Sequence, residues 1–360
     1  MGNKVKLGFV GAGGIISHAH MPGAKLIADK IEFVAISDPL VDKAKVLADA
    51  NGIKNVYADY NDMLKKEKLD AIVIGTPNAF HSDTAIQGLK AGCHVLVEKP
   101  MALNAKQAQD MKDAAIENDK FLAVGFNQRF SNEAQLLKRL IIGGELGEIY
   151  YAKTGAIRRR GIPGWGGWFT NKKLSGGGPL IDIGVHMLDL TLWLMGYPKP
   201  VAVSGSTYTK FGDRKDYVSA GGWKYKGDSK TFTVEDLASA FIKFDNGMTL
   251  FLEAAWASNT ESEKLYSTLF GTKGGADWRP LKVYKDTHGM LVDMVPVVPA
   301  QSVKSHALQM KHFIELISEG KWKDKKTDVQ IATADTGLII MKLIDAIYKS
   351  SEEGKEVRIK

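Results

Sequence analysis

Apolar runs and amphipathic stretches alternate through the first third of the chain. The apolar runs that we expect to form strands are Val5–Val10, Phe33–Ser37, Ala71–Gly75, His94–Val97 and Phe121–Val124. The intervening stretches that can form helices are Ala19–Ala28, Val41–Ala50, Ser82–Ala91 and Ala105–Ile116. Strands that are separated by helices predict a parallel sheet with right-handed crossovers, so this part of the chain has the pattern of an α/β domain.

The pattern changes after about residue 130, where strand signals follow one another closely. We expect further strands at Tyr150–Ile157, Val201–Thr209, Phe241–Phe244, Met248–Glu253 and Leu265–Gly271. The helices that we expect there are Leu180–Leu194, Leu308–Ile317 and Ile331–Tyr348. Asp245-Asn246-Gly247 joins two of the strands, and Asn-Gly is typical of a tight primed hairpin turn. The sequence therefore predicts two domains, residues 1–128 and residues 129–360, the second with a largely antiparallel sheet.

Composition places the chain among globular proteins. Its 360 residues are 44% hydrophobic and 25% charged, which suits a protein with sizeable buried cores. Cys93 is the single cysteine, so no intrachain disulfide forms, and a reducing cytoplasm is the expected location. The net charge of +7 is scattered rather than gathered into a basic run with aromatics. We therefore expect no nucleic-acid partner, and no apolar run has the length of a membrane span.

A glycine-rich turn follows the first expected strand directly. It contains Gly11, Gly13 and Gly14 and continues into Ile15 and Ile16. Such a turn lets the backbone approach a pyrophosphate at a helix N-terminus. Asp38 ends the second strand, where a carboxylate can accept hydrogen bonds from an adenosine ribose, and no cation follows at Pro39 or Leu40 to pair with a 2′-phosphate. These features favour NAD over NADP, although Ile16 replaces the usual small residue and should widen the helix–strand gap.

A carboxylate and an imidazole lie four residues apart in the segment Ser175–Leu190. If this segment is helical, Asp182 and His186 share one face, and the preceding glycines let a small molecule approach the start of the helix. Taken alone, His186 is a core histidine and Asp182 a helix-terminal carboxylate. Asp189 lies on the same face as structural support, or as the third member of a metal set. No metal is expected, because a second histidine at ligand spacing is missing.

Glu98-Lys99-Pro100 follows the expected strand His94–Val97. Ligands of open α/β sheets bind beyond the carboxyl ends of the strands, so Lys99 is expected in the cleft, although a lone lysine there is usually solvated. Asn127 and Arg129 follow the last strand of the series. They reach the same cleft, or they begin the next helix.

In combination, these motifs resemble the glucose-fructose oxidoreductase / inositol dehydrogenase / rhizopine catabolism family. The motifs that occur in the family's order are Gly11-x-Gly13-Gly14, Thr76-Pro77-Asn78 with His81, Glu98-Lys99-Pro100 and Gly178-x-x-x-Asp182-x-x-x-His186. The resemblance spans the whole chain. It implies a Rossmann domain with a doubly wound parallel sheet, then an α+β domain with an open-faced sheet. It also implies an NAD(P) cofactor and sugar or polyol substrates, with Thr76, Pro77, Asn78, His81 and Glu98 among the cofactor-binding residues.

The expected chemistry is hydride transfer between a secondary hydroxyl and the nicotinamide. Neutral His186 can serve as the general base, since its reference pKa lies close to working pH. Asp182 can orient a substrate hydroxyl and the imidazole, and Lys99 can stabilise the developing oxyanion. One alternative is an NAD-dependent glycosidase that uses transient oxidation. Another is a non-catalytic NAD-sensing regulator, and the presence of Lys99, Asp182 and His186 counts against it.

The segment Gly161–Phe169 is a glycine-hinged aromatic loop. Trp165 and Trp168 can form a wall against the C–H faces of a sugar, or they can form an oligomer contact. Arg158 begins a run of three arginines that can hold an anionic group of the substrate, although a solvated run is the plainer interpretation.

Apolar residues of both parities occur in the expected strand Met248–Glu253. Leu250 and Leu252 would point to one face of the sheet and Phe251 to the other. A sheet that carries apolar residues on its second face must be covered. We therefore expect a homodimer or homotetramer that forms through this sheet.

Overall fold

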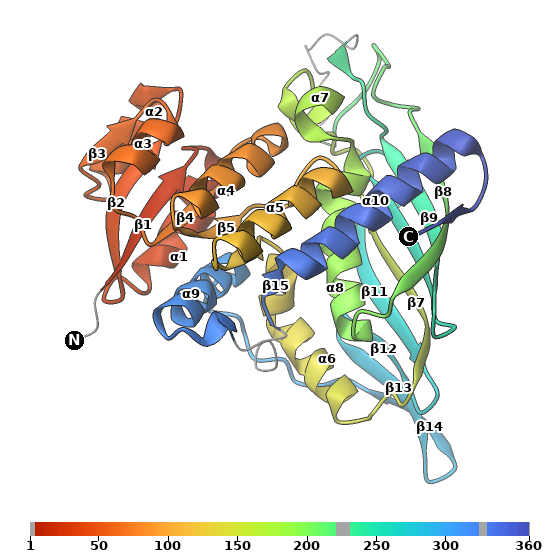
Figure 1. Cartoon of the computed structure of the whole chain (residues 1–360). Coiled ribbons are helices and arrows are strands. Elements are labelled where there is room, and N and C mark those ends of the chain that lie inside the picture. Colours follow the sequence, from red (N-terminus) through yellow and green to blue (C-terminus); the bar gives the residue numbers. More distant parts are fainter. Residues whose placement is uncertain (1–3, 221–230, 324–329, 360) are drawn as a thin grey trace. The chain divides into compact units, whose positions relative to one another are not determined.

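The computed structural model describes residues 4–220, 231–323 and 330–359. The chain forms two compact units, whose elements are labelled in Figure 1. Met1–Phe130 with Gln301–Leu338 form the first unit, and Ser131–Ala300 with Ile339–Lys360 form the second. The sequence placed all residues after 128 in one domain. The structure differs, because Gln301–Leu338 belongs to the first unit.

The first unit contains a seven-stranded sheet in the order β15-β6-β5-β4-β1-β2-β3. The strands are β1 (Val5–Val10), β2 (Ile31–Ser37), β3 (Asn55–Tyr57), β4 (Ala71–Ile74), β5 (His94–Val97), β6 (Leu122–Val124) and β15 (Ala332–Thr333). Neighbouring strands run parallel, apart from β15, which is antiparallel to β6. The predicted parallel sheet is confirmed. Its strand order reverses between β1 and β4, and ligands of such sheets bind at this point.

Helical segments connect these strands. They are η1 (Ile16–His20), α1 (Met21–Lys25), α2 (Val41–Asp49), α3 (Tyr60–Lys66), η2 (Asn78–Phe80), α4 (His81–Lys90), α5 (Ala105–Glu117), η3 (Asn127–Phe130), α9 (Ser305–Ser318) and η7 (Lys321–Lys323). The predicted helix Ala19–Ala28 begins earlier than expected and ends at Lys25, because the glycine turn leads straight into the π-helix η1.

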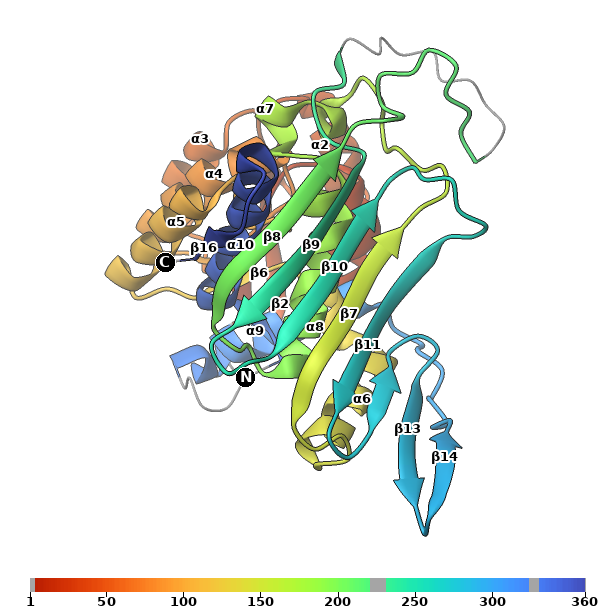
Figure 2. The ribbon, with the colours of Figure 1, turned by 90° about the vertical axis from the view of Figure 1, so that its right-hand side faces the viewer.

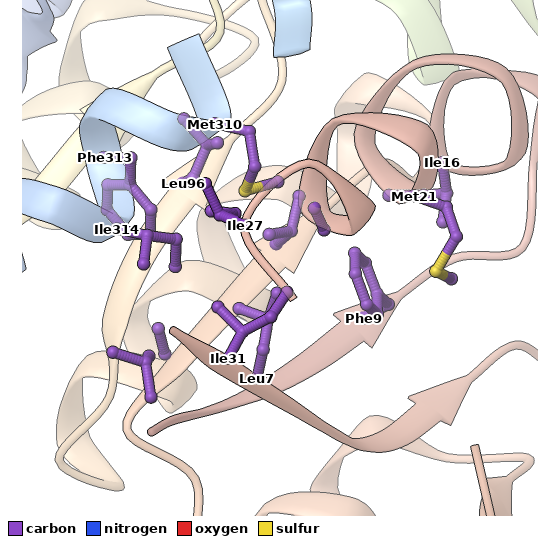
Figure 3. Close-up of a cluster of buried hydrophobic side chains, with 14 of the residues drawn as sticks. Leu7, Phe9, Ile16, Met21, Ile27, Ile31, Leu96, Met310, Phe313 and Ile314 are labelled. Atoms are coloured by element: carbon purple, nitrogen blue, oxygen red, sulfur yellow. The ribbon is translucent and has the colours of Figure 1, made fainter. Parts of the chain in front are cut away.

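A buried apolar cluster explains why the late segment returns to the first unit. Leu7 and Phe9 of β1 lie in this cluster with Met310 and Phe313 of α9 (Figure 3). Burying an apolar side chain of this size contributes about 1.5–3 kcal/mol. Helix α9 is therefore held by the same core as the central strands.

The second unit contains a nine-stranded sheet in the order β14-β13-β12-β11-β7-β10-β9-β8-β16. The strands are β7 (Ile149–Ile157), β8 (Pro200–Tyr208), β9 (Leu237–Phe244), β10 (Thr249–Ala255), β11 (Lys264–Gly271), β12 (Gly275–Asp277), β13 (Lys282–Thr287), β14 (Met290–Met294) and β16 (Val357–Arg358). Only the pairing of β7 with β10 is parallel among these neighbours. The mainly antiparallel sheet predicted from the sequence is confirmed.

The helical segments of the second unit include α6 (Asn132–Ile142), η4 (Trp168–Thr170), α7 (Lys172–Ser175), η5 (Leu180–Gly184) and α8 (Val185–Met195). Helix α10 (Ala334–Glu353) begins in the first unit and continues into the second. Figure 2 shows α8 behind the sheet, with the opposite face of the sheet toward the viewer. Side chains of β10 differ between the two faces of the sheet, since Leu250 and Leu252 are fully buried while Phe251 is only partly buried.

The hairpin between β9 and β10 has a different turn from the predicted one. Gly247 has a φ of +86°, whereas Asn246 is not among the residues with positive φ. The amide of Gly247 donates to the carbonyl of Phe244 at 3.2 Å, and the amide of Phe244 donates to the carbonyl of Met248 at 3.0 Å. The loop is therefore a three-residue turn that ends in a left-handed glycine, rather than a two-residue primed turn.

The stretch Lys172–Met195 has the length and composition of a membrane span, whereas no run of that length is expected from the sequence. Within the structure, 83% of its apolar window is buried. It is a core helix of the second unit, and its apolar character serves packing.

Candidate active site

Gly11 forms the tight turn that follows β1. Its φ of +96° lies in the left-handed region, and a Cβ at this position would meet the carbonyl oxygen of Gly75 at 2.8 Å. By contrast, a Cβ added at Gly13 or Gly14 would meet nothing closer than 3.8 or 3.7 Å. The turn therefore leaves open space beside the backbone where η1 begins, which suits a phosphate group.

Ile16 is the departure from the usual glycine fingerprint, and the structure accommodates it in two ways. Its side chain is fully buried, and it occupies space that a Cβ on Gly75 would need, at 2.8 Å. It also begins η1, whose π-helical turn is wider than an α-helical turn. The expected gap between helix and strand is filled by the side chain of Ile16, which fits there because Gly75 carries no side chain.

Asp38 lies just beyond β2, with its carboxylate against the glycine turn. Its Oδ2 accepts a hydrogen bond from the amide of Ala12 at 2.7 Å, and its Oδ1 accepts one from the amide of Leu40 at 2.8 Å. An ionised carboxylate has about four acceptor positions, so about two remain for ribose hydroxyls.

Lys99 follows β5 and is the one residue between Val95 and Ala102 that is not buried. Buried neighbours on both sides hold its backbone, while Lys99 itself is partly exposed. Glu98 beside it is buried, and both of its carboxylate oxygens already have partners. Its Oε1 lies 2.7 Å from His20 Nε2, and its Oε2 accepts the amide of Lys99 at 3.1 Å.

The pKa of Glu98 is lowered to about 2. Burial is the largest single influence and works in the opposite direction. It is outweighed by the hydrogen bond from His20 together with electrostatic interactions with His20, His306 and Lys99. Glu98 is therefore ionised at neutral pH.

His81 is fully buried and is engaged by the backbone. Its Nδ1 lies 2.7 Å from the carbonyl oxygen of Pro100, and its Nε2 lies 3.0 Å from that of Thr76. Burial lowers its pKa, so the ring is neutral at pH 7 and donates to one of these carbonyls at a time. The ring ties the loop after β4 to the loop after β5. This position does not support the direct cofactor contact that the family resemblance implied.

Thr76, Pro77 and Asn78 lead from β4 into η2, next to the glycine turn. The hydroxyl of Thr76 is buried and has no hydrogen-bond partner among the described residues. Asn127 of η3 donates from Nδ2 to Ser305 Oγ at 2.7 Å, and its buried Oδ1 likewise has no partner within the described ranges. These two groups and the open glycine turn fit a dinucleotide. Arg129, also in η3, is buried and belongs to the core.

Asp182 and His186 lie on one helical segment of the second unit, as predicted. Asp182 is in η5 and His186 is in α8, which continues it without a break. Along Leu180–Met195, only Asp182, Ile183 and His186 are not buried. Two polar side chains one turn apart are thus accessible on an otherwise buried helix. A π-helical turn in a helix often marks a functional site.

Trp256 holds Asp182, and no motif in the sequence indicated this role. Its indole Nε1 donates to Asp182 Oδ2 at 2.9 Å, and its side chain is fully buried. The alternation of buried and partly exposed residues along β10 could have indicated Trp256, which follows the last residue of this strand. Leu250, Leu252 and Ala254 are buried toward the helices, and Trp256 continues this parity.

The glycines before Asp182 have a packing role instead of the predicted role in substrate access. A Cβ on Gly177 would meet the hydroxyl of Tyr348 at 1.9 Å, and one on Gly178 would meet the carbonyl oxygen of Glu235 at 2.0 Å. The space beside these two glycines is therefore already filled. The carboxylate of Glu235 accepts from the amides of Gly178 and Leu180 at 2.9 and 3.1 Å, so it caps the start of the helix.

The predicted aromatic wall is only partly available to a substrate. Trp165 is buried in a cluster with Tyr217, Phe232 and Trp256, so it does not present a free ring. Trp168 is partly exposed and stacks on Phe169 with ring centroids 3.8 Å apart.

Arg158 and Asp189, two further candidates, are engaged within the second unit. Arg158 donates from Nη1 to the carbonyl of Gly161 at 3.0 Å, which supports a role in shaping its own loop rather than in holding an anionic substrate group. Asp189 is fully buried and accepts from the hydroxyl of Tyr197 at 2.7 Å, as expected of structural support.

The first unit has the strand order, glycine turn and carboxylate of a dinucleotide-binding domain, and the second presents a carboxylate–imidazole pair. This combination defines a two-domain nucleotide-dependent oxidoreductase. Comparison with known families agrees. The model described as "Oxidoreductase family, NAD-binding Rossmann fold" matches residues 5–126, and that of the GFO/IDH/MocA C-terminal domain matches residues 134–277. The chain belongs to the Gfo/Idh/MocA oxidoreductase family.

Individual relatives cover nearly the whole chain. The chain is 36% identical over 358 residues to D-glucoside 3-dehydrogenase of Escherichia coli, covering 99% of this chain and 98% of that protein. It is 27% identical over 320 residues to scyllo-inositol 2-dehydrogenase (NAD(+)) of Bacillus subtilis, covering 88% and 84%. A solved structure of levoglucosan dehydrogenase in complex with NADH and L-sorbose has the same fold, with a TM-score of 0.85, 21% identity and 99% coverage of both chains.

Proposed function

We propose that this chain is an NAD-dependent dehydrogenase that oxidises a secondary hydroxyl of a sugar or cyclitol. The observation that carries the proposal is the accessible pair of Asp182 and His186 on an otherwise buried helix. The similarity to D-glucoside 3-dehydrogenase supports a D-glucoside as the first substrate to test, with the hydroxyl on carbon 3 as the first candidate position.

The chain's own residues supply the proton chemistry. His186 removes the hydroxyl proton as a general base. Asp182, held by Trp256, orients the hydroxyl and the imidazole. Lys99 donates a hydrogen bond to the reacting oxygen and stabilises its developing negative charge. Bound NAD supplies the hydride acceptor.

The cofactor would be held by the first unit. The turn at Gly11, Gly13 and Gly14 is suited to the pyrophosphate, and Thr76 and Asn127 offer buried polar atoms that have no hydrogen-bond partner among the described residues. Asp38 would accept hydrogen bonds from the adenosine ribose, which favours NAD over NADP. Leu40 beside it is exposed and brings no positive charge for a 2′-phosphate.

We also propose that the enzyme is a homo-oligomer that forms through the open face of the second sheet. Phe241 is 36% exposed on that face, next to Phe251 on the neighbouring strand. Tyr151 and Phe270 stack there, with ring centroids 5.3 Å apart. An aromatic face of this kind suits burial against a second copy.

A substrate screen tests the proposed activity. Methyl glucosides, free sugars, inositols and anhydrosugars are incubated with NAD, and the absorbance of the reduced nicotinamide is followed. We expect sustained, stoichiometric NADH formation with at least one of them. Cleavage of a glycoside without accumulation of NADH would instead identify a glycosidase that oxidises its substrate only transiently. Tight NAD binding without turnover of any compound would count against an enzyme.

A further inference from the structure

We propose that His20 and Glu98 form a buried pair that positions Lys99, and that Glu98 acts through the lysine backbone without binding the cofactor itself. This inference rests on the proposed function, because it takes Lys99 to be a catalytic residue. All three residues belong to the first unit.

The orientation of His20 follows from its hydrogen bond. The ring is fully buried in η1, directly after the glycine turn, and its Nε2 lies 2.7 Å from Glu98 Oε1. An ionised carboxylate can only accept, so Nε2 must be the donor. Nδ1 of His20 has no partner among the described residues. The bond to Glu98 is therefore the hydrogen bond that orients this ring.

The second oxygen of Glu98 contacts the backbone of Lys99. Oε2 accepts the backbone amide of Lys99 at 3.1 Å. The carboxylate cannot shift easily, because it fills space left by Gly125, where an added Cβ would lie 3.0 Å from Glu98 Cδ and Oε1. His20, the Glu98 carboxylate and the Lys99 backbone are thus connected by two hydrogen bonds.

Charged and titratable groups from several elements face Glu98. They are His20 from η1, His306 from α9, His81 from α4 and Lys99 itself, and Lys304 acts on His306. Burial lowers the pKa of both His81 and His306, so these two rings are neutral at pH 7. The donors that directly satisfy the Glu98 carboxylate are therefore His20 and the Lys99 amide, and removing His20 leaves the Lys99 amide as its one direct donor among the described residues.

Two substitutions of His20 test the pair against a matched control. His20→Met removes the donor, and His20→Gln restores an amide donor near the position of Nε2. Gln309→Met is the control, since Gln309 is also fully buried in the first unit and donates to the carbonyl of Val124 at 3.0 Å. We expect His20→Met to lower kcat about tenfold or more while the Kd for NAD changes less than about threefold. His20→Gln should recover most of the lost kcat, and Gln309→Met should keep it.

The pH dependence of unfolding provides a readout that needs no turnover. In the native protein the lowered pKa of Glu98 stabilises the fold above about pH 4.5, and this contribution is lost as the pH falls toward about 2. In His20→Met the hydrogen bond from His20 is lost while burial remains, so we expect the pKa of Glu98 to rise and the stability lost between about pH 4.5 and pH 2 to be smaller. Urea unfolding of His20→Met should show this smaller loss, whereas Gln309→Met should keep the native dependence.

Three results would overturn the proposal. One is native kcat in His20→Met. Another is a loss of NAD affinity as large as the loss of kcat, since Glu98 would then contact the cofactor. The third is a native pH dependence of unfolding in His20→Met, which would show that His20 does not control Glu98. Failure of the native protein to reduce NAD with any substrate would remove the proposed function separately, and the unfolding measurement would still test the pair.

Discussion

At the scale of single residues, the proposed site depends on side chains that are held before any ligand arrives. Trp256 fixes Asp182, and Ala12 with Leu40 fixes Asp38. A carboxylate that is already oriented loses less conformational freedom when it binds a hydroxyl. We therefore expect the indole of Trp256 to contribute to catalysis although it is buried.

Trp256→Phe tests this contribution. The substitution keeps most of the buried ring and removes the donor to Asp182, and a hydrogen bond to a charged group is worth about 1.5–3 kcal/mol. We expect kcat/KM to fall about tenfold to a hundredfold. Trp278→Phe is the control, because Trp278 is also fully buried and its indole nitrogen has no hydrogen-bond partner within the described residues. Equal losses in both variants would argue against a specific role of Trp256.

Lys99→Ala and His186→Ala test the proposed chemistry directly. Each should lower kcat about a hundredfold or more, the usual scale for a positioned acid–base group. NADH affinity, measured by fluorescence titration, should change little, because the proposed dinucleotide contacts involve other residues. Near-normal turnover in either variant would remove that residue from the mechanism.

Asp38 should decide the choice of cofactor. In NADP a phosphate replaces the 2′-hydroxyl, and it would face the Asp38 carboxylate at close range. The lost hydrogen bond and the repulsion together are worth about 2–4 kcal/mol, or about thirty- to a thousandfold in specificity. Asp38→Ser should narrow the ratio of kcat/KM for NAD and NADP. Equal kcat/KM for the two cofactors in the native enzyme would show that Asp38 does not contact the ribose.

The sequence could predict the residues that stand in local motifs but not those that support them. Lys99 could be proposed because it follows a predicted strand, and Asp182 and His186 because they lie four residues apart; their catalytic roles stay predictions. His20 and Trp256 act on residues 78 and 74 positions away, and no local pattern reports such contacts. The roles of Trp165 and Gly178 were misjudged because an exposed loop and a tightly packed one have similar sequences.

At the scale of elements, the helical segment η5–α8 presents Asp182 and His186 and is fixed at its start by Glu235. Strands were predicted well where apolar runs were continuous, as in β5, whose bounds His94–Val97 were found as expected. The short strand β3 and helix α3 were missed, since neither Asn55–Tyr57 nor Tyr60–Lys66 has a clear apolar periodicity.

Glu235→Ala tests the anchoring of this helix. The substitution leaves the amides of Gly178 and Leu180 and the hydroxyl of Tyr348 without their buried acceptor, so we expect a loss of about 1–3 kcal/mol in the free energy of unfolding. Burial raises the pKa of Glu235, and a raised pKa adds stability at low pH that is lost as the pH rises. The deficit should therefore be larger below about pH 4.5 than at neutral pH.

Tyr348→Phe is the matched control for this prediction. It removes one of the three donors to Glu235 and leaves the helix cap in place, so urea denaturation should show a smaller loss than for Glu235→Ala. A deficit in Glu235→Ala no greater than that in Tyr348→Phe would mean that the cap does not stabilise the helix.

At the scale of the whole molecule, the two-part architecture followed from the change in hydrophobic pattern near residue 130. The return of Gln301–Leu338 to the first unit did not, because the apolar face of a helix does not reveal which core it joins. Met310 and Phe313 would suit either core by composition alone.

The open face of the second sheet should form a homo-oligomer interface. Light scattering at micromolar concentration should give the mass of a dimer or tetramer, and Phe251→Glu should shift it toward the monomer by placing a charge in the interface. Val46→Glu is the control, because Val46 is 73% exposed on α2 of the first unit. A monomeric native protein would contradict the prediction.

Deuterium transfer tests the proposed reaction most directly. A D-glucoside that carries deuterium on carbon 3 is incubated with the native enzyme and NAD, and the NADH formed is examined by mass spectrometry. We predict one deuterium in each NADH, with a rate about a hundredfold lower in His186→Ala. If NADH forms without deuterium while the sugar retains its label, this carbon is not the hydride donor, and the assignment to carbon 3 fails. If no deuterated sugar or cyclitol passes its label to NAD, the chain is not a dehydrogenase of this class.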